Sequence, residues 1–181
     1  MKYCLKYTNI CTKLNKADEI SIKYIEDKGV KTIVDTTGQS LLGVLKYEPF
    51  LIKPNHYELG ELFGVELKTR EEITQYAKKL VELGAQNVII SMGEDGALFI
   101  NKDGAFEYVQ APKGKVVDTV GAGDSVIAGF ISEYVTTLSA KRAFYRAVAT
   151  GTATAFSDEL ATKEESDKLY KLIKKENGQY L

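Results

Sequence analysis

Three short apolar segments separated by helical patterns constrain the fold more than any other feature of this chain. "KTIVD" (31–35), "FLIKPN" (50–55) and "NVIIS" (87–91) have the length and residue types of buried strands. A short helical pattern, "GQSLLGVL", follows the first, and a capped amphipathic helix at 69–83 precedes the third. Strands that alternate with helices predict an α/β fold with a mostly parallel sheet, covered by helices on both faces.

Further segments extend this pattern. Residues 18–29 have near-helical apolar spacing, and "ALFIN" and "AFEYVQ" flank the turn "KDG", which predicts a hairpin. Apolar helices are predicted at about 122–136 and 139–156, and a charged helix, "ATKEESDKLYKLIKKE", follows them. The first 16 or so residues show no clear period, so we expect them to be loosely ordered.

Composition limits the function classes. The chain has 181 residues, of which 44% are apolar, and a formal net charge of −1. This length fits one ordinary domain, and the near-zero charge gives no basic field for nucleic acid or an anionic membrane. No apolar run reaches the roughly 18 residues of a transmembrane helix, and the N-terminus lacks the apolar core of a signal peptide. We therefore expect a cytoplasmic protein.

The cysteines and the single histidine argue against two common kinds of site. Cys4 and Cys11 have no His or Cys cluster near them, which favours free thiols over a metal site or a disulfide. His56 is the only histidine in the sequence. A Ser-His-Asp triad or a multi-histidine metal centre therefore has almost no residues to use.

The strongest chemical motif is "DTVGAGD" (118–124), which stands before an apolar helix. Gly121 and Gly123 lack Cβ atoms, so their backbone can approach a ligand closely. The first amides of the following helix are unpaired and its dipole is positive there, which makes an anion site suited to a phosphoryl group. Asp124 in the first turn could deprotonate an acceptor hydroxyl, or it could merely stabilise the helix N-terminus. The spacing fits neither a Rossmann fingerprint nor a Walker P-loop.

Two neighbouring motifs suit the same chemistry. Asn55 and Glu58 lie at i and i+3 in "KPNHYELGE", where the pair could hold the water shell of Mg²⁺. The same pair could equally form a capping box. "SMGEDGA" is a strand-end glycine turn that could approach a nucleotide, although an ordinary β-turn explains it equally well.

Taken in order, "DTTG", "LIKPNHYEL", "VIISMGEDGALFI", "VVDTVGAGDSVIAGF" and "GTATAFSDELAT" resemble the ribokinase-like (PfkB) carbohydrate kinases. Within that family they look most like 1-phosphofructokinases, followed by tagatose-6-phosphate kinases. The resemblance implies a three-layer α/β/α ribokinase-like fold. It also implies transfer of the ATP γ-phosphate to a sugar-phosphate hydroxyl, with ATP and Mg²⁺ as cofactors.

The resemblance assigns roles to positions of this sequence. Asp124 is implied as the catalytic base, with Gly121, Ala122 and Gly123 as the anion hole, and Asn55 and Glu58 match the N-x-x-E motif linked to Mg²⁺. The nucleotide-binding positions that it implies are Ser91, Gly93, Gly96, Thr119, Thr150, Gly151 and Ala153. The adenine pocket is expected between the stretch around 112–119 and the helix that holds Thr150.

The match covers only the C-terminal part of such kinases. We expect residues 1–17 to be a segment that does not match and 18–181 to be the nucleotide-binding part, with the sugar-gripping N-terminal half and β lid missing. Two hypotheses follow: a phosphosugar kinase that acts on fructose-1-phosphate or tagatose-6-phosphate, or a non-catalytic nucleotide-binding remnant. We also expect the isolated chain to self-associate or to bind a complementary N-terminal half, because a truncated sheet exposes an edge or face.

Overall fold

A computed structural model describes residues 3–7 and 30–177. Its residues form two compact units. The first unit comprises the described residues up to Ser91 together with Leu98–Phe106, and the second comprises Met92–Ala97 and the described residues from Glu107 onward. The predicted helix at 18–29 lies outside the described residues.

The strands follow one another in the sheet in the same order as in the sequence. They are β1 (Tyr3–Tyr7), β2 (Lys31–Asp35), β3 (Leu51–Ile52), β4 (Asn87–Ser91), β5 (Ala97–Asn101) and β6 (Phe106–Val109). The first four strands are parallel, with Ile33 opposite Leu51 and Ile52 opposite Val88. The connection from β4 to β5 is too short for a parallel crossover, so the sheet is mixed. The predicted strands and hairpin are confirmed, whereas β1 lies in a segment expected to be loosely ordered.

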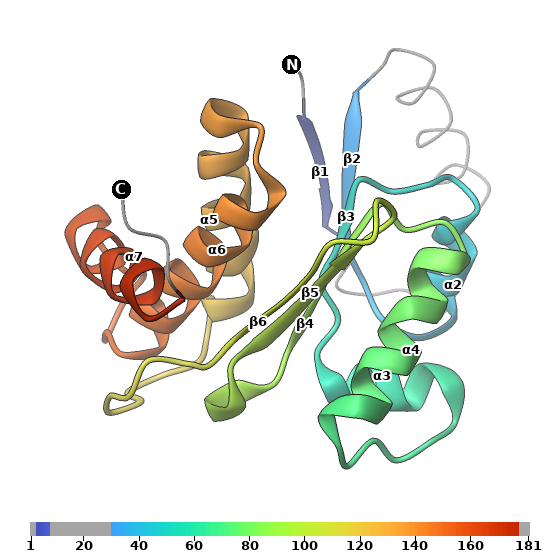
Figure 1. Cartoon of the computed structure of the whole chain (residues 1–181), viewed down its shortest axis with the longest axis horizontal. Helices are drawn as coiled ribbons and strands as arrows, with labels where there is room; N and C mark the ends of the chain where they lie inside the picture. Colours follow the sequence, from blue (N-terminus) through green and yellow to red (C-terminus); the bar gives the residue numbers. More distant parts are fainter. Residues whose placement is uncertain (1–2, 8–29, 178–181) are drawn as a thin grey trace. The chain divides into compact units, whose positions relative to one another are not determined.

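Three helices cover one face of β2–β4 in the first unit. They are α2 (Gly38–Leu45), α3 (His56–Phe63) and α4 (Arg70–Glu82). They connect successive parallel strands that advance in one direction, and right-handed crossovers then place all three on the same side, as Figure 1 shows. Leu41, Leu59 and Leu80 contribute to the core from these helices, each 2% exposed or less.

Local sequence signals set the ends of α4. Thr69 accepts a hydrogen bond from the Glu72 amide, and the Glu72 carboxylate accepts one from the Thr69 amide. This is a capping box, and it satisfies amide groups that the first turn leaves unpaired. Ile73 and Ala77 are buried on the inner face of α4. The predicted cap and the 69–83 helix are therefore confirmed to within a residue.

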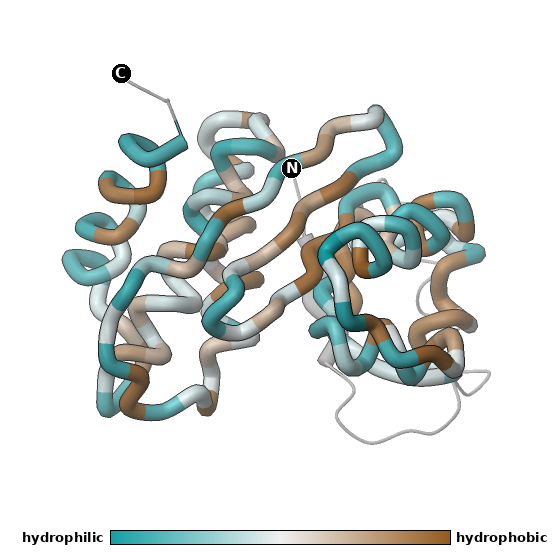
Figure 2. Tube along the Cα trace, turned by 60° about the horizontal axis from the view of Figure 1, so that its bottom comes forward, coloured by the Kyte–Doolittle hydropathy of each residue, from teal (hydrophilic) through white to brown (hydrophobic). Residues whose placement is uncertain are grey.

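The second unit contains the helices α5 (Ala122–Thr137), α6 (Ala140–Ala155) and α7 (Lys163–Glu176). A short link at Leu138 and Ser139 makes α5 and α6 an antiparallel pair. In Figure 2 the helix next to the C-terminus, α7, is mostly teal with brown segments, as expected for a helix with one buried face. In the part of the chain that the structure describes, no helix is long and apolar enough to cross a membrane.

A buried carboxylate joins these three helices. Glu133 of α5 is 8% exposed. Its Oε1 accepts hydrogen bonds from Arg142 Nε at 3.1 Å on α6 and from Tyr170 Oη at 2.9 Å on α7. Arg146 Nε lies 3.7 Å from the other carboxylate oxygen. Burial and the hydrogen bond to Glu133 raise the pKa of Tyr170. Two guanidinium groups and a phenol therefore compensate one desolvated charge.

Glu133→Gln should destabilise the second unit by about 3 kcal/mol, because it removes the charged acceptor that Arg142 and Tyr170 share and leaves Arg146, among the described residues, with only Asp167 as an ionic partner. The free energy of unfolding in urea, followed by far-UV circular dichroism, measures this loss. Glu159→Gln, at an exposed loop position, is the matched control and should change stability by less than about 0.5 kcal/mol. Equal stability of the two variants would contradict a stabilising role for the Glu133 network.

Candidate active site

The N-x-x-E motif lies where β3 leads into α3. Beyond Pro54, Asn55 forms a parallel bridge with Ser91 at the carboxyl end of β4. The Asn55 side chain accepts from the Glu58 amide at 2.9 Å, and Glu58 Oε2 accepts from the Asn55 amide at 2.7 Å. The capping box expected as one alternative for this pair is therefore present. It fixes Asn55 and Glu58 at the carboxyl edge of the parallel strands, where ligands bind in open α/β sheets.

His56 adds a second connection between these segments. Its Nδ1 lies 3.4 Å from the carbonyl oxygen of Ser91, and its ring lies 3.8 Å from the ring of Tyr57, centroid to centroid. The carbonyl oxygen can only accept, so this contact is a hydrogen bond in the tautomer that has its proton on Nδ1. The start of α3 and the end of β4 are therefore bonded through both backbone and side chain.

The donor atoms of this motif fit Mg²⁺ bound largely through water. The capping box uses Glu58 Oε2, and no described residue donates to Glu58 Oε1. Oxygen ligands with several retained waters are the usual Mg²⁺ arrangement, so a single free carboxylate oxygen is a compatible contribution. The described residues contain no group of three or more His, Cys, Asp or Glu side chains that could bind a metal directly.

Lys53 and Asp35 form an ion pair at the same edge, which the sequence reasoning missed. Lys53 Nζ lies 3.7 Å from Asp35 Oδ1, and the Lys53 side chain is only 10% exposed. Asp35 ends β2, and Lys53 directly follows β3, its parallel neighbour. Charged residues immediately after two adjacent apolar strands were the signal in the sequence. A nearly buried ammonium group two residues before Asn55 is suited to an anionic ligand.

The strand-end glycine turn consists of Met92 to Gly96 in the second unit and contains the 3₁₀ turn η1 (Gly93–Asp95). The Met92 amide donates to the Gly96 carbonyl oxygen at 2.9 Å, which closes the turn. Gly96 has φ +90°, and a Cβ atom there would lie 2.0 Å from the Val109 carbonyl oxygen. Only glycine fits this position. Gly93 and Gly96 thus belong to one closed turn, while Ser91 ends β4 in the first unit.

The "DTVGAGD" motif forms the turn that begins α5. Gly121 is the N-cap with φ +76°, and the Ala122 amide donates to the Thr119 carbonyl oxygen at 3.1 Å. The Val120 amide donates to Asp118 Oδ1 at 3.0 Å, so the loop before the glycines is also fixed. Asp124 lies in the first helical turn and is exposed. The predicted helix start and the placement of the carboxylate are both confirmed.

Helix α6 packs against this turn. Gly151 lies so close to α5 that a Cβ atom would be 2.5 Å from Val126 and 3.2 Å from the Ala122 carbonyl oxygen. Thr154 Oγ1 donates to Ser125 Oγ at 2.8 Å within the same buried contact. The position of α6 therefore determines where the first turn of α5 points.

The stretch expected to border an adenine pocket lies beside the end of α6. The Val117 amide donates to the Ala155 carbonyl oxygen at 2.8 Å, and Gly114 packs on the ring of Phe156. On α6 itself, Ala153 is 2% exposed, and the Thr150 hydroxyl lies 2.7 Å from Ser166 Oγ of α7. The second unit thus brings Thr119, Gly121, Ala122, Gly123 and Asp124 into one turn supported by α6.

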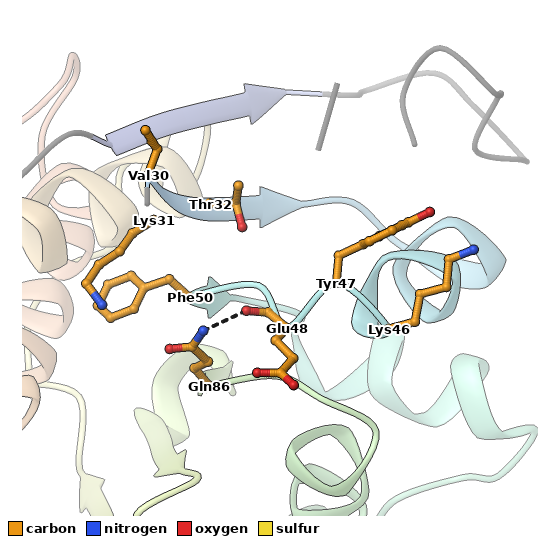
Figure 3. Close-up of a pocket in the computed structure, with 8 residues that line it drawn as sticks. All are labelled: Val30, Lys31, Thr32, Lys46, Tyr47, Glu48, Phe50 and Gln86. Carbon is orange, nitrogen blue, oxygen red and sulfur yellow. Dashed lines mark hydrogen bonds between the residues drawn. The ribbon is translucent and has the colours of Figure 1, made fainter. Parts of the chain in front are cut away.

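A cavity of about 400 Å³ lies at the opposite end of the strands (Figure 3). Lys31 Nζ lies 4.2 Å from the centre of the Phe50 ring, and Gln86 Nε2 donates to the Glu48 carbonyl oxygen at 2.8 Å. Burial and the charge of Lys102 lower the pKa of Lys31. The cavity is at the amino-terminal ends of β2–β4, so it is separate from the motif residues of the first unit. It is lined by Val30, Lys31, Thr32, Lys46, Tyr47, Glu48, Phe50 and Gln86.

The sequence profile of the pfkB family of carbohydrate kinases matches residues 10–167. The chain belongs to this family. Among curated relatives, it is 44% identical over 149 residues to a 1-phosphofructokinase of Bacillus subtilis, a match that covers 82% of this chain and 49% of the relative. It is 39% identical over 139 residues to a D-tagatose-1-phosphate kinase of Bacillus licheniformis, covering 76% of this chain and 45% of that one.

Solved structures confirm the ribokinase-like α/β fold. A putative phosphofructokinase from Staphylococcus aureus superposes with a TM-score of 0.84 and 35% identity, covering 93% of this chain and 55% of that chain. An Arabidopsis thaliana ribokinase complexed with ribose and ATP gives a TM-score of 0.72 and 26% identity, covering 83% of this chain and 50% of that one. The chain therefore spans about half the length of the relatives it matches, as the partial resemblance predicted.

Gly121→Ala should disturb the start of α5 without unfolding the second unit. An alanine would have to adopt a positive φ, and its Cβ would lie 2.7 Å from Leu160 Cδ2. We expect a loss of about 1–3 kcal/mol in the free energy of unfolding, with altered amide NMR shifts concentrated in the first turn of α5. Gly104→Ala, at positive φ with nothing within 4 Å of the added Cβ, is the control for the φ penalty alone. Equal effects of the two substitutions would exclude a packing constraint at Gly121.

Proposed function

We propose that this chain carries the phosphoryl-transfer site of an ATP-dependent phosphosugar kinase of the 1-phosphofructokinase type. The observation that carries the proposal is the turn at Gly121, which opens α5 with Asp124 in the first turn. Backbone amides at a helix N-terminus attract phosphate oxygens, and a carboxylate beside them is available for a proton. Membership of a carbohydrate kinase family and the names of the relatives support this assignment.

In the proposed reaction Asp124 removes the proton from the acceptor hydroxyl of the sugar phosphate. That oxygen forms a bond to the γ-phosphorus of ATP while the bond between phosphorus and the leaving ADP oxygen breaks. The amides of Gly121 and Gly123 stabilise the negative charge on the transferring phosphoryl oxygens, and the Ala122 amide joins them by exchanging its bond to the Thr119 carbonyl oxygen. Little covalent chemistry is required of the protein, so most of the rate enhancement comes from position and charge.

The donor nucleotide is proposed to lie along Ser91, Gly93, Gly96 and Thr119. Its adenine is assigned to the region between residues 112–119 and the α6 residues Thr150, Gly151 and Ala153. The bond between Val117 and Ala155 supports this assignment, because it brings the two segments together. Asn55 and Glu58 would hold Mg²⁺ through its water shell. When bound, the ion neutralises phosphate charge, and Lys53 adds a fixed positive charge at the same edge.

The acceptor is proposed to be a ketohexose phosphate. Fructose-1-phosphate is favoured by the 1-phosphofructokinase relatives, and tagatose phosphates are the second choice because a D-tagatose-1-phosphate kinase is also similar. We propose that residues 18–181 are the nucleotide-binding part. The family profile begins at residue 10, so at the N-terminus only the residues before it lie outside the matching region. The alternative is a nucleotide-binding remnant, or a half that needs a complementary chain. The chain covers 49% of the length of the Bacillus subtilis relative.

The experiment that separates these alternatives is a coupled ADP-release assay with fructose-1-phosphate and with tagatose phosphates. It is run on this chain alone and with the N-terminal half of the Bacillus subtilis relative supplied. Turnover by this chain alone supports the kinase. Turnover only with the supplied half supports a half that needs a complementary chain, and nucleotide binding without turnover in both cases supports the remnant. Absence of any calorimetric signal with Mg-ATP, for a chain shown to be folded, would exclude both readings.

Asp124→Asn should lower kcat by about 10²–10⁴-fold, because general-base catalysis typically contributes a factor of that size. The measurement uses the chain alone if it is active, and otherwise the chain with the supplied N-terminal half. The affinity for Mg-ATP, measured by calorimetry, should stay within about threefold of the unmodified chain. If Asp124 only stabilises the helix N-terminus, the substitution costs about 1 kcal/mol of stability and leaves turnover nearly unchanged. Asp103→Asn, in the exposed hairpin turn, is the control and should alter neither quantity.

Lys53→Met should weaken Mg-ATP binding by about tenfold, because it removes a poorly solvated positive charge from the proposed phosphate region. Calorimetric titration at constant ionic strength measures the effect. Loss of Lys53 also removes one ion pair of Asp35. The double variant Asp35→Asn with Lys53→Met therefore separates the effect on stability from the effect on binding. Lys68→Met, whose side chain is 69% exposed, is the matched control. Normal affinity in Lys53→Met would show that the pair is only structural.

A further inference from the structure

Two side chains of the second unit bond the strand-end glycine turn from one side. Tyr108 Oη donates to the carbonyl oxygen of Asp95 at 2.6 Å. Gln110 Nε2 donates to the carbonyl oxygen of Glu94 at 3.0 Å. Tyr108 belongs to β6 and Gln110 directly follows this strand. The two residues are two positions apart in an extended segment, so their side chains project to the same side. Two successive carbonyl groups of the turn are therefore bonded by one pair of side chains.

The two side chains also bond each other. Tyr108 Oη lies 2.7 Å from Gln110 Oε1. A phenol has one proton, so it donates to either Asp95 or Gln110 at a given moment, and both acceptors remain within reach. Contact with Tyr108 through Oε1 orients the planar amide of Gln110, which directs Nε2 toward Glu94. The pair acts as a single unit, and each residue orients the other.

Among the described residues, three backbone hydrogen bonds and one steric contact are the other constraints on this turn. Gly93, Glu94 and Asp95 are exposed, so apolar burial does not order them. Within the turn, the Met92 amide donates to the Gly96 carbonyl oxygen at 2.9 Å, the Asp95 amide donates to the Met92 carbonyl oxygen at 3.2 Å, and the Gly96 amide donates to the Gly93 carbonyl oxygen at 3.0 Å. The carbonyl groups of Glu94 and Asp95 receive their bonds from Gln110 and Tyr108 instead. Gly96 adds a steric limit, because its α-carbon lies close to the Val109 carbonyl oxygen.

We propose that Tyr108 and Gln110 are positioning residues for the nucleotide: their bonds to Asp95 and Glu94 hold the Gly93–Gly96 turn in its binding conformation. The inference rests on the proposed function, in which this turn lies along ATP. An ordered turn pays no ordering entropy when the ligand binds, so loss of the pair weakens affinity although neither side chain touches the nucleotide.

The test uses the full chain with Tyr108→Phe, Gln110→Met and the double variant. Each substitution keeps approximate side-chain volume and removes the hydrogen bond. We expect amide exchange at Asp95 and Gly96, measured by NMR without nucleotide, to become about three- to tenfold faster. The Mg-ATP dissociation constant should rise by a similar factor, with the urea midpoint of the second unit unchanged. The double variant should lose less than the product of the single effects, because the residues act as a unit.

Tyr76→Phe is the matched control, because it removes a phenol from α4 and keeps the ring against Phe63. It should change neither exchange nor affinity. Unaltered exchange at Asp95 and Gly96 in the double variant would overturn the inference while leaving the proposed function intact. Faster exchange with an unchanged dissociation constant would also overturn it, because order in the turn would then not matter to the nucleotide. Failure of the unmodified chain to bind Mg-ATP would instead refute the proposed function, and the inference with it.

Discussion

Parallel pairing of β2, β3 and β4 is the constraint on which the first unit depends. Each of these parallel pairs forms only after the chain has returned along the sheet, and helices make both returns: α2 between β2 and β3, and α3 with α4 between β3 and β4. The carboxyl ends of the three strands then all face the same edge. This is why Asp35, Lys53, Asn55 and Ser91, which are far apart in sequence, end up at one boundary of the sheet.

Close helix contact has the corresponding role in the second unit. The anion site proposed at Gly121 depends on the direction of the first turn of α5, and α6 sets that direction through Gly151 and the bond from Thr154 to Ser125. At the far end of α5, the Glu133 carboxylate joins all three helices. Helix α5 is thus fixed at its start by the close contact with Gly151 and near its end by the buried charge of Glu133.

Much of this could be predicted from the sequence because the signals are local. Capping residues satisfy the amides of the first turn of their own helix. Thr69 and Asn55 therefore predicted two helix starts, and the structure confirms both. Short apolar runs predicted β2, β4 and β5. A strand that is buried on both faces has no alternation of polar and apolar residues, so it appears in the sequence as a continuous apolar run. The β1 strand was missed, because its pairing with β2 depends on a partner about 28 positions away in the register and leaves no local pattern.

The sequence by itself determined most element types, their order and the glycine-rich motif at 118–124, because each depends on neighbours within a few positions. Only the tertiary structure decided which distant groups meet. It paired Lys53 with Asp35 and placed Tyr108 and Gln110 on the carbonyl groups of Glu94 and Asp95. Such contacts depend on the register of strands and on side-chain direction in three dimensions. A long-range hydrogen bond or ion pair stabilises only the folded chain. It requires no particular spacing between its residues in the sequence, so the sequence alone does not predict it.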